Sequence, residues 1–157
     1  MSAICYPLKL ERPPRPSRRD FLARPGRYTP TRWNPAGCHL AADIAAPLGT
    51  DALAVLPLKI THADAYGSLG RAVAGVDERY GYEWWYAHLQ RITVREGERI
   101  ERRAQIGDVG HSGNATGDHL HLVVLAEPLQ GRSWGSVPFL DPYPFLLEAW
   151  RDLTADA

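Results

Sequence analysis

Two short fragments of the sequence carry side chains with the chemistry and spacing of a metal site. His39 and Asp43 are separated by three residues, and His119 and His121 by one. A catalytic zinc ion takes three protein ligands from His, Asp or Glu and keeps a fourth position open for water. We therefore expect His39, Asp43 and His121 to bind the metal, with His119 beside it.

The donor set favours zinc as the single cofactor. A carboxylate with two imidazoles suits zinc better than magnesium or calcium, which prefer sites made of oxygen. Strand residues two apart lie on one face, roughly 6.5 Å apart, so His119 and His121 can face one cleft. Each fragment alone has a simpler interpretation, because two strand histidines are commonly ordinary polar residues and a surface His and Asp can cap a turn.

Two further fragments follow in order, Tyr86-Ala87-His88-Leu89 and the segment from Ser112 to His121. Together with the first fragment they resemble the zinc-dependent peptidoglycan endopeptidases of the lysostaphin type, peptidase family M23. The resemblance covers roughly residues 37 to 146. It implies hydrolysis of peptide cross-links or stem peptides in bacterial peptidoglycan, as a phage lysin would perform it.

The same resemblance implies that His88 and His119 act in the reaction without binding the metal. Zinc lowers the pKa of its water to about 7, and no His-Glu-x-x-His motif supplies a glutamate base. We expect His119 to be the general base and His88 to hydrogen-bond to the developing oxyanion or to orient the water. The two roles can be exchanged, because the unperturbed pKa of histidine, about 6.5, suits either task. His62 and His111 match no position of the pattern.

Three residues depart from the family pattern without being ligands. Ala41 and Arg103 stand where glycines are common, which puts the local backbone in question because a residue with a Cβ does not freely adopt positive φ. Asp118 stands where a proline usually precedes His-Leu-His, so it could change the pKa of His119 or the shape of the cleft. An alternative function is therefore a catalytically weak domain of the same fold that binds or activates at the wall.

A third interpretation is a small protein stabilised by a structural zinc ion. Such a site is closed by a fourth protein ligand, which Cys38 or Cys5 would have to supply. The simpler expectation for the two cysteines is a pair of reduced thiols.

Short runs of β-branched and aromatic residues between Gly, Asp and Asn predict a mainly β fold built on an antiparallel sheet with a substrate groove. Trp84, Trp85 and Tyr86 alternate faces in one run, with core packing the default for each. A short helix over 142–153 should follow, opened by prolines and carrying one apolar face. The candidate strands are 53–56, 59–62, 72–76, 82–89, 105–109 and 119–125.

Length and composition predict one folded domain over residues 36–157, preceded by a basic arm over residues 1–35. The chain has 157 residues, of which 45% are hydrophobic, enough for a real core and too many for a disordered tail. Residues 1–32 hold eight Lys or Arg and two acidic residues, so this part is basic. The whole chain has no net charge, so the remaining residues are acidic to the same extent. We expect this proline-rich arm to be a solvated, extended leader. Binding of an acidic wall polymer is the alternative, and no specific nucleic-acid partner is expected.

The first ten residues do not combine a basic region with a following apolar run, so we expect no secretory signal peptide. No stretch reaches the length of a membrane span. A wall hydrolase of this kind would be made in the cytoplasm and act after release through a lysis system or from a virion, or it would be part of a larger exported protein. Oligomeric state is left open.

Overall fold

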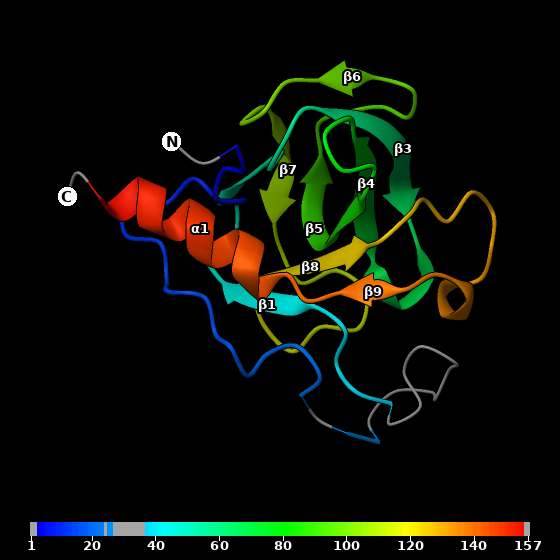
Figure 1. Cartoon of the computed structure of the whole chain (residues 1–157), viewed down its shortest axis with the longest axis horizontal. Coiled ribbons are helices and arrows are strands. Elements are labelled where there is room, and N and C mark those ends of the chain that lie inside the picture. Colours follow the sequence, from blue (N-terminus) through cyan, green and yellow to red (C-terminus); the bar gives the residue numbers. More distant parts are fainter. Residues whose placement is uncertain (1–2, 24, 27–36, 156–157) are drawn as a thin grey trace.

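The fold is an open, mostly antiparallel β-sheet flanked by one helix (Figure 1). This computed structural model describes residues 3–23, 25–26 and 37–155. The strand order is β1-β8-β5-β4-β3-β6, with β7 paired to both β5 and β2 and with β9 paired to β8. The strands are β1 (Ala42–Ala45), β2 (Asp51–Leu53), β3 (Leu58–Ala65), β4 (Arg71–Asp77), β5 (Glu83–Ile92), β6 (Arg99–Ile100), β7 (Gln105–Val109), β8 (His119–Leu125) and β9 (Phe139–Leu140).

The helical segments are η1 (Gly67–Leu69), η2 (Trp134–Ser136) and α1 (Tyr143–Thr154). Residue Pro144 lies in the first turn of α1, where a proline costs no hydrogen bond. The antiparallel fold class and the closing helix are therefore confirmed. The expected groove along the sheet stays a prediction.

Five of the six predicted strands are present, with small changes at their ends. The segment 53–56 is the exception, because β2 ends at Leu53 and the chain bends at Val55 and Leu56. A register shift between Ala52 and Leu53 breaks the ladder there. The backbone N–H of Val55 then donates to the Tyr86 hydroxyl, at 3.0 Å, instead of to a strand partner.

The two faces of the central strands β5 and β8 serve different purposes. Trp84, Tyr86 and Leu122 are buried in the main core, which α1 covers with Leu146. Trp85 lies between Trp84 and Tyr86 in the strand, so its side chain points to the opposite face, where it packs with Val123 and Leu125 in a smaller cluster. The alternation of strand side chains thus leaves one face of the sheet for groups other than the main core.

Residues 4–8 of the N-terminal segment are part of the folded domain. Ile4, Tyr6 and Leu8 are buried in the main core, and Leu8 forms an antiparallel bridge with Ala52 of β2. The expectation of a solvated leader is therefore wrong for these first residues, because their apolar side chains are covered by the sheet and α1. The domain boundary at residue 36 stays a prediction.

The basic part of the arm is extended and largely exposed, but it follows α1 (Figure 1). The Trp150 indole N–H donates to the Pro13 carbonyl at 3.1 Å. The guanidinium groups of Arg15 and Arg18 lie over the rings of Trp150 and Tyr143, 5.7 and 5.4 Å from the ring centres.

Across the described residues, no helix combines the length and apolar character needed to cross a membrane.

Shortening Leu8 to alanine should lower the free energy of unfolding by about 2 to 5 kcal/mol, because the change removes a buried side chain and leaves a cavity. The matched control is Leu48→Ala, at a position where the leucine is 54% exposed, compared with 1% for Leu8. Urea unfolding followed by tryptophan fluorescence measures the difference. Equal midpoints for the two variants would show that the N-terminal segment is not part of the folded core.

Candidate active site

Strand pairing brings the predicted metal-binding residues together. Asp43 of β1 lies directly opposite His121 of β8, and His121 lies opposite Ala87 of β5. Opposed residues of an antiparallel pair point to the same face with their Cβ atoms about 5 Å apart. His39 lies in the segment just before β1, and its side chain meets those of Asp43 and His121, so the three predicted ligands form one cluster.

The three donor atoms lie within metal-binding reach of one another. His39 Nε2 is 3.3 Å from Asp43 Oδ1 and 3.4 Å from His121 Nδ1, and His121 Nδ1 is 2.7 Å from Asp43 Oδ1. Ligand bonds of 2.0 to 2.2 Å in a tetrahedral zinc site place neighbouring donors about 3.3 to 3.5 Å apart. The two distances from His39 match these values, and the 2.7 Å between His121 and Asp43 is that of a hydrogen bond that a zinc ion would replace. Two imidazole nitrogens and one carboxylate oxygen in this arrangement suit a zinc ion.

The charges of the cluster are arranged to receive a cation. Burial opposes ionisation of Asp43, but hydrogen bonds from His121 and His39 outweigh it and hold the pKa of Asp43 well below its usual range. Burial likewise lowers the pKa of His39, while the carboxylates of Asp43 and Asp20 outweigh this effect and raise it. A bound metal ion would take the place of the imidazole protons that now face the Asp43 carboxylate.

His88 and His119 form a second group with His121 on the same face. The ring centre of His88 lies 5.0 Å from that of His119 and 5.3 Å from that of His121. His88 Nδ1 donates to the Ser112 carbonyl, and His119 Nδ1 donates to the Gly117 carbonyl, both at 2.8 Å. Because carbonyls only accept, each neutral ring carries its proton on Nδ1 and keeps Nε2 available for chemistry.

The backbone at His88 is strained in a way that aims its ring. His88 has a φ of 61°, in the left-handed region that a residue with a Cβ seldom adopts. Such a conformation costs about 1 to 3 kcal/mol and persists when the surroundings enforce it. Burial lowers the pKa of His88, and the nearby rings of His121 and His119 lower it further. The hydrogen bond to the Ser112 carbonyl has the opposite effect, which is smaller than that of burial. The lowered pKa of His88 favours its neutral form, and the backbone and the Ser112 carbonyl fix the orientation of its ring.

The loop before β8 is fixed by a close crossing of two backbones. Gly113, at φ 74°, passes so near Gly70 that a Cβ at residue 113 would overlap the Gly70 nitrogen and the Ser68 carbonyl. The neighbouring Ser112 hydroxyl donates to the Leu89 carbonyl at 2.6 Å. The Ser112 carbonyl is the group of this loop that contacts His88.

The departures from the family pattern have simple structural outcomes. Ala41 is buried and is not among the described residues with positive φ, so its Cβ causes no strain there. Arg103 does adopt a φ of 71°, so this turn keeps the conformation that glycine would favour. Asp118 pairs with His111, with Oδ1 2.6 Å from Nδ1, and not with its neighbour His119.

An aromatic cluster lies on the same face of the sheet as the histidines. The Trp85 ring packs against Tyr66 and Trp134, with ring centres 5.0 and 4.9 Å away, and His62 stacks on it at 5.3 Å. Trp85 therefore faces the site side, whereas Trp84 and Tyr86 pack in the main core as expected. His62 belongs to this cluster and not to either group of metal-binding candidates.

Neither cysteine belongs to the groups of convergent donors found in the described residues. Cys5 and Cys38 are both buried, and neither takes part in a disulfide bond. The Cys5 thiol donates to the Ala54 carbonyl at 3.0 Å, and burial raises its pKa. A fourth protein ligand that would close the site as a structural zinc centre is thus not provided by these residues.

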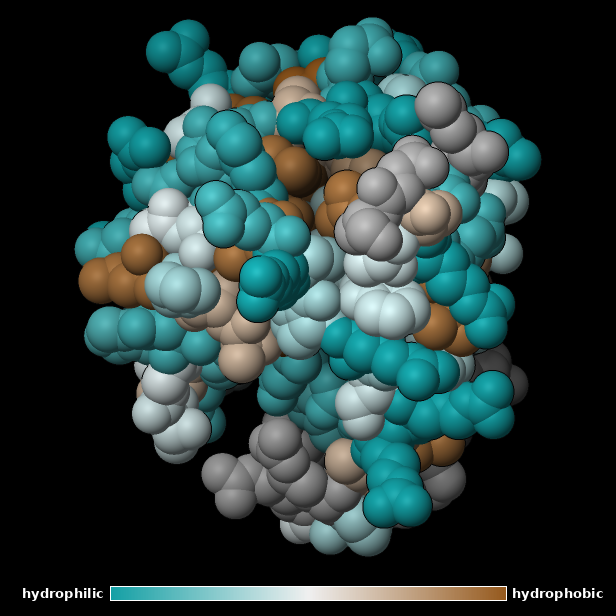
Figure 2. All heavy atoms as spheres, turned by 90° about the vertical axis from the view of Figure 1, so that its left-hand side faces the viewer, coloured by the Kyte–Doolittle hydropathy of each residue, from teal (hydrophilic) through white to brown (hydrophobic). Residues whose placement is uncertain are grey.

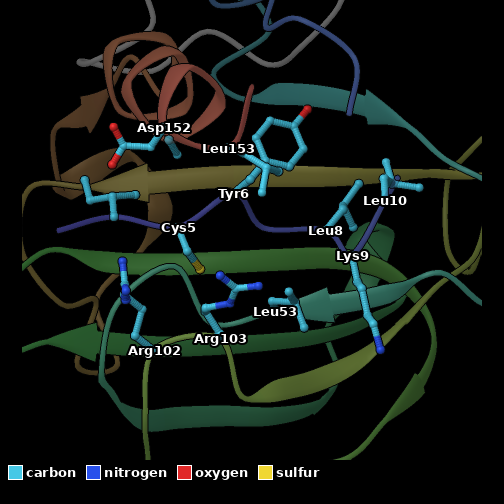
Figure 3. A pocket seen from close by; sticks show the side chains of 12 residues that line it. Cys5, Tyr6, Leu8, Lys9, Leu10, Leu53, Arg102, Arg103, Asp152 and Leu153 are labelled. Carbon is cyan, nitrogen blue, oxygen red and sulfur yellow. The ribbon is translucent and has the colours of Figure 1, made fainter. Parts of the chain in front are cut away.

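A separate pocket lies between the N-terminal segment, the end of α1 and the turn at residues 102–103. Figure 2 looks onto the side where both termini lie, with hydrophobic side chains in hollows between hydrophilic ones. The pocket has a volume of about 250 Å³ and is lined by apolar side chains together with Lys9, Arg102, Arg103 and Asp152 (Figure 3). It shares no residue with the histidine cluster.

Comparisons with known proteins agree with the geometry. A family model described as Peptidase family M23 matches residues 37–131. The peptidoglycan DD-endopeptidase ShyC of Vibrio cholerae is 30% identical over 110 residues, which are 68% of this chain and 25% of that protein. The DD-carboxypeptidase/endopeptidase Mpg of Neisseria meningitidis serogroup B is 39% identical over 111 residues, 71% of this chain and 25% of that protein.

Solved structures give the same picture for the fold. The catalytic domain of lysostaphin from Staphylococcus simulans superposes with a TM-score of 0.65 at 28% identity, covering 78% of this chain and 87% of that domain. The chain spans about a quarter of the length of the curated relatives that it matches. Since the family model matches more than half of its residues, the chain belongs to peptidase family M23.

Proposed function

We propose that this chain is a zinc-dependent endopeptidase that cleaves peptide cross-links or stem peptides of bacterial peptidoglycan. The observation that carries the proposal is the convergence of His39, Asp43 and His121, whose donor atoms lie 2.7 to 3.4 Å apart. One relative is named a peptidoglycan DD-endopeptidase and another a DD-carboxypeptidase/endopeptidase, and the wall substrate is inferred from the first of these names.

His39, Asp43 and His121 would hold the zinc ion through Nε2, a carboxylate oxygen and Nδ1. When bound there, zinc would polarise a peptide carbonyl and make a water molecule more acidic. Three protein ligands leave one coordination position for water or substrate, which is the composition of a catalytic rather than a structural site.

His119 is the proposed general base. Its Nδ1 donates to the Gly117 carbonyl, so its Nε2, which lies 3.6 Å from Asp43 Oδ1, can accept a proton from the attacking water. The ring can then pass this proton to the leaving amine. Its side chain is 18% exposed, which leaves it reachable by a substrate from solvent.

His88 is the proposed partner of His119 on the same face. As a neutral ring with its proton on Nδ1, it would accept a hydrogen bond at Nε2 and orient the water. Once Nε2 has gained a proton, it would donate to the developing oxyanion. Both rings are fixed through Nδ1 to a backbone carbonyl, so the roles of His88 and His119 can be exchanged. No carboxylate is needed as the base in this arrangement.

The substitutions His121→Ala and His119→Ala should separate metal binding from proton transfer. His121→Ala should lose zinc and activity together, because it removes one of three ligands. His119→Ala should keep about one zinc per chain while the rate falls about 10²- to 10⁴-fold, the usual contribution of a general base. Bound zinc is measured by atomic absorption, and hydrolysis by new amino termini released from purified peptidoglycan.

The matched control is His111→Ala, since His111 is exposed and pairs with Asp118 outside the cluster. This variant should keep its zinc. A wild-type chain that binds zinc and opens no bond in walls of several cross-link types would contradict the peptidase proposal and favour a domain that only binds the wall.

Replacing Gly113 by alanine should slow hydrolysis at least tenfold with little loss of bound zinc. The new Cβ would overlap the Gly70 backbone and displace Ser112, whose carbonyl orients His88. Gly97→Ala is the control, because it also changes a glycine with positive φ, at 85°, but has open space around the new atom. Equal rates of peptidoglycan hydrolysis in the two variants would show that the Ser112 loop does not set the orientation of His88.

A further inference from the structure

Asp20, in the N-terminal segment, contacts both proposed ligands that lie around the start of β1. Its side-chain Oδ2 accepts a hydrogen bond from the backbone N–H of Asp43. Its backbone carbonyl accepts from His39 Nδ1 at 3.0 Å, and its Oδ1 lies 3.5 Å from the same nitrogen. Asp20 thus lies behind the two ligands, on the side of His39 away from His121.

The residues after Asp20 hold the backbone of His39 as well. The Leu22 N–H donates to the His39 carbonyl at 2.6 Å, and the His39 N–H donates to the Ala23 carbonyl at 2.7 Å. Leu22 adopts a φ of 63° in this turn, a conformation that leucine takes up only where its surroundings enforce it. Residues 20–23 therefore hold His39 by its N–H, its carbonyl and its ring.

These contacts have a chemical consequence for metal binding. A carbonyl only accepts, so the Asp20 carbonyl holds a proton on His39 Nδ1, and Nε2, which points at Asp43 and His121, is the nitrogen that a metal ion would bind. The Asp20 carboxylate near the same N–H makes the imidazole a more basic ligand. The Asp20 side chain is 16% exposed, so these interactions are partly shielded from water.

We propose that Asp20 is a positioning residue for the metal site, which fixes His39 and Asp43 in the arrangement that binds zinc. The inference rests on the proposed function only in requiring that His39, Asp43 and His121 bind the metal. It gives the N-terminal segment a part in the site, because residues 13–18 lie along α1 and lead directly to Asp20.

The test compares zinc affinity in Asp20→Ala, Asp20→Asn and the wild-type chain by competition with a chromogenic chelator. Asp20→Ala keeps the backbone carbonyl but removes the carboxylate that holds the Asp43 N–H and lies beside His39 Nδ1. It should bind zinc about 10- to 100-fold more weakly, the usual effect of losing an outer partner of metal ligands. Asp20→Asn keeps an oxygen for the Asp43 N–H but lacks the charge, so its affinity should lie between the other two. The control is Arg19→Ala, the adjacent exposed residue, which should bind as the wild type does.

Two further measurements separate positioning from general folding. Thermal unfolding of the metal-free proteins should differ little between Asp20→Asn and Arg19→Ala. At saturating cobalt, the visible absorption of the bound ion should change in both Asp20 variants and not in Arg19→Ala, because it reports ligand geometry.

Zinc affinities of Asp20→Ala and Asp20→Asn within twofold of the wild type would overturn the inference. If Asp20→Ala does not fold, the affinity and cobalt spectrum of Asp20→Asn decide in the same way. Failure of the proposed function would look different, because the wild-type chain itself would then bind no zinc, or would bind zinc and open no bond in peptidoglycan.

Discussion

The pairing of β1 with β8 is the constraint on which the proposed site depends. Its register places the Asp43 carboxylate opposite His121 and the Ala45 backbone opposite His119. A shift of one residue would turn these side chains to the other face of the sheet, into the main core. The apolar residues that alternate with them, Leu120 and Leu122, are completely buried there. Packing of the core therefore specifies the register, and the register places the proposed ligands next to one another.

Backbone carbonyls then orient the rings that the register brings together. His39, His88 and His119 each donate from Nδ1 to a carbonyl, those of Asp20, Ser112 and Gly117. Each carbonyl belongs to a loop or irregular segment. The sheet therefore fixes where most of the side chains lie, and the loops fix how the rings are turned. In the proposed centre, this division would let a face with several histidines hold one ion and leave two rings for proton transfer.

Much of this arrangement could be predicted from the sequence because it is local. The strands over 105–109 and 119–125 follow from dense apolar and β-branched runs, and the spacing of His119 and His121 indicates a shared face. The end of β2 could not be predicted, since Val55 leaves the sheet to bond the Tyr86 hydroxyl, a distant partner. Ser112 and Asp20 were missed for a related reason. Ser112 acts through its carbonyl, which every residue has, and Asp20 meets His39 only after folding.

The most direct test of the proposed centre is X-ray absorption at the zinc edge of the zinc-loaded chain. The arrangement of His39, Asp43 and His121 predicts a first shell of nitrogen and oxygen at about 2.0 to 2.2 Å, with the imidazole scattering of two histidines. A sulfur scatterer at about 2.3 Å would instead place a cysteine on the metal and indicate a closed, structural site. A shell of oxygen alone would show that the two histidines do not bind the ion.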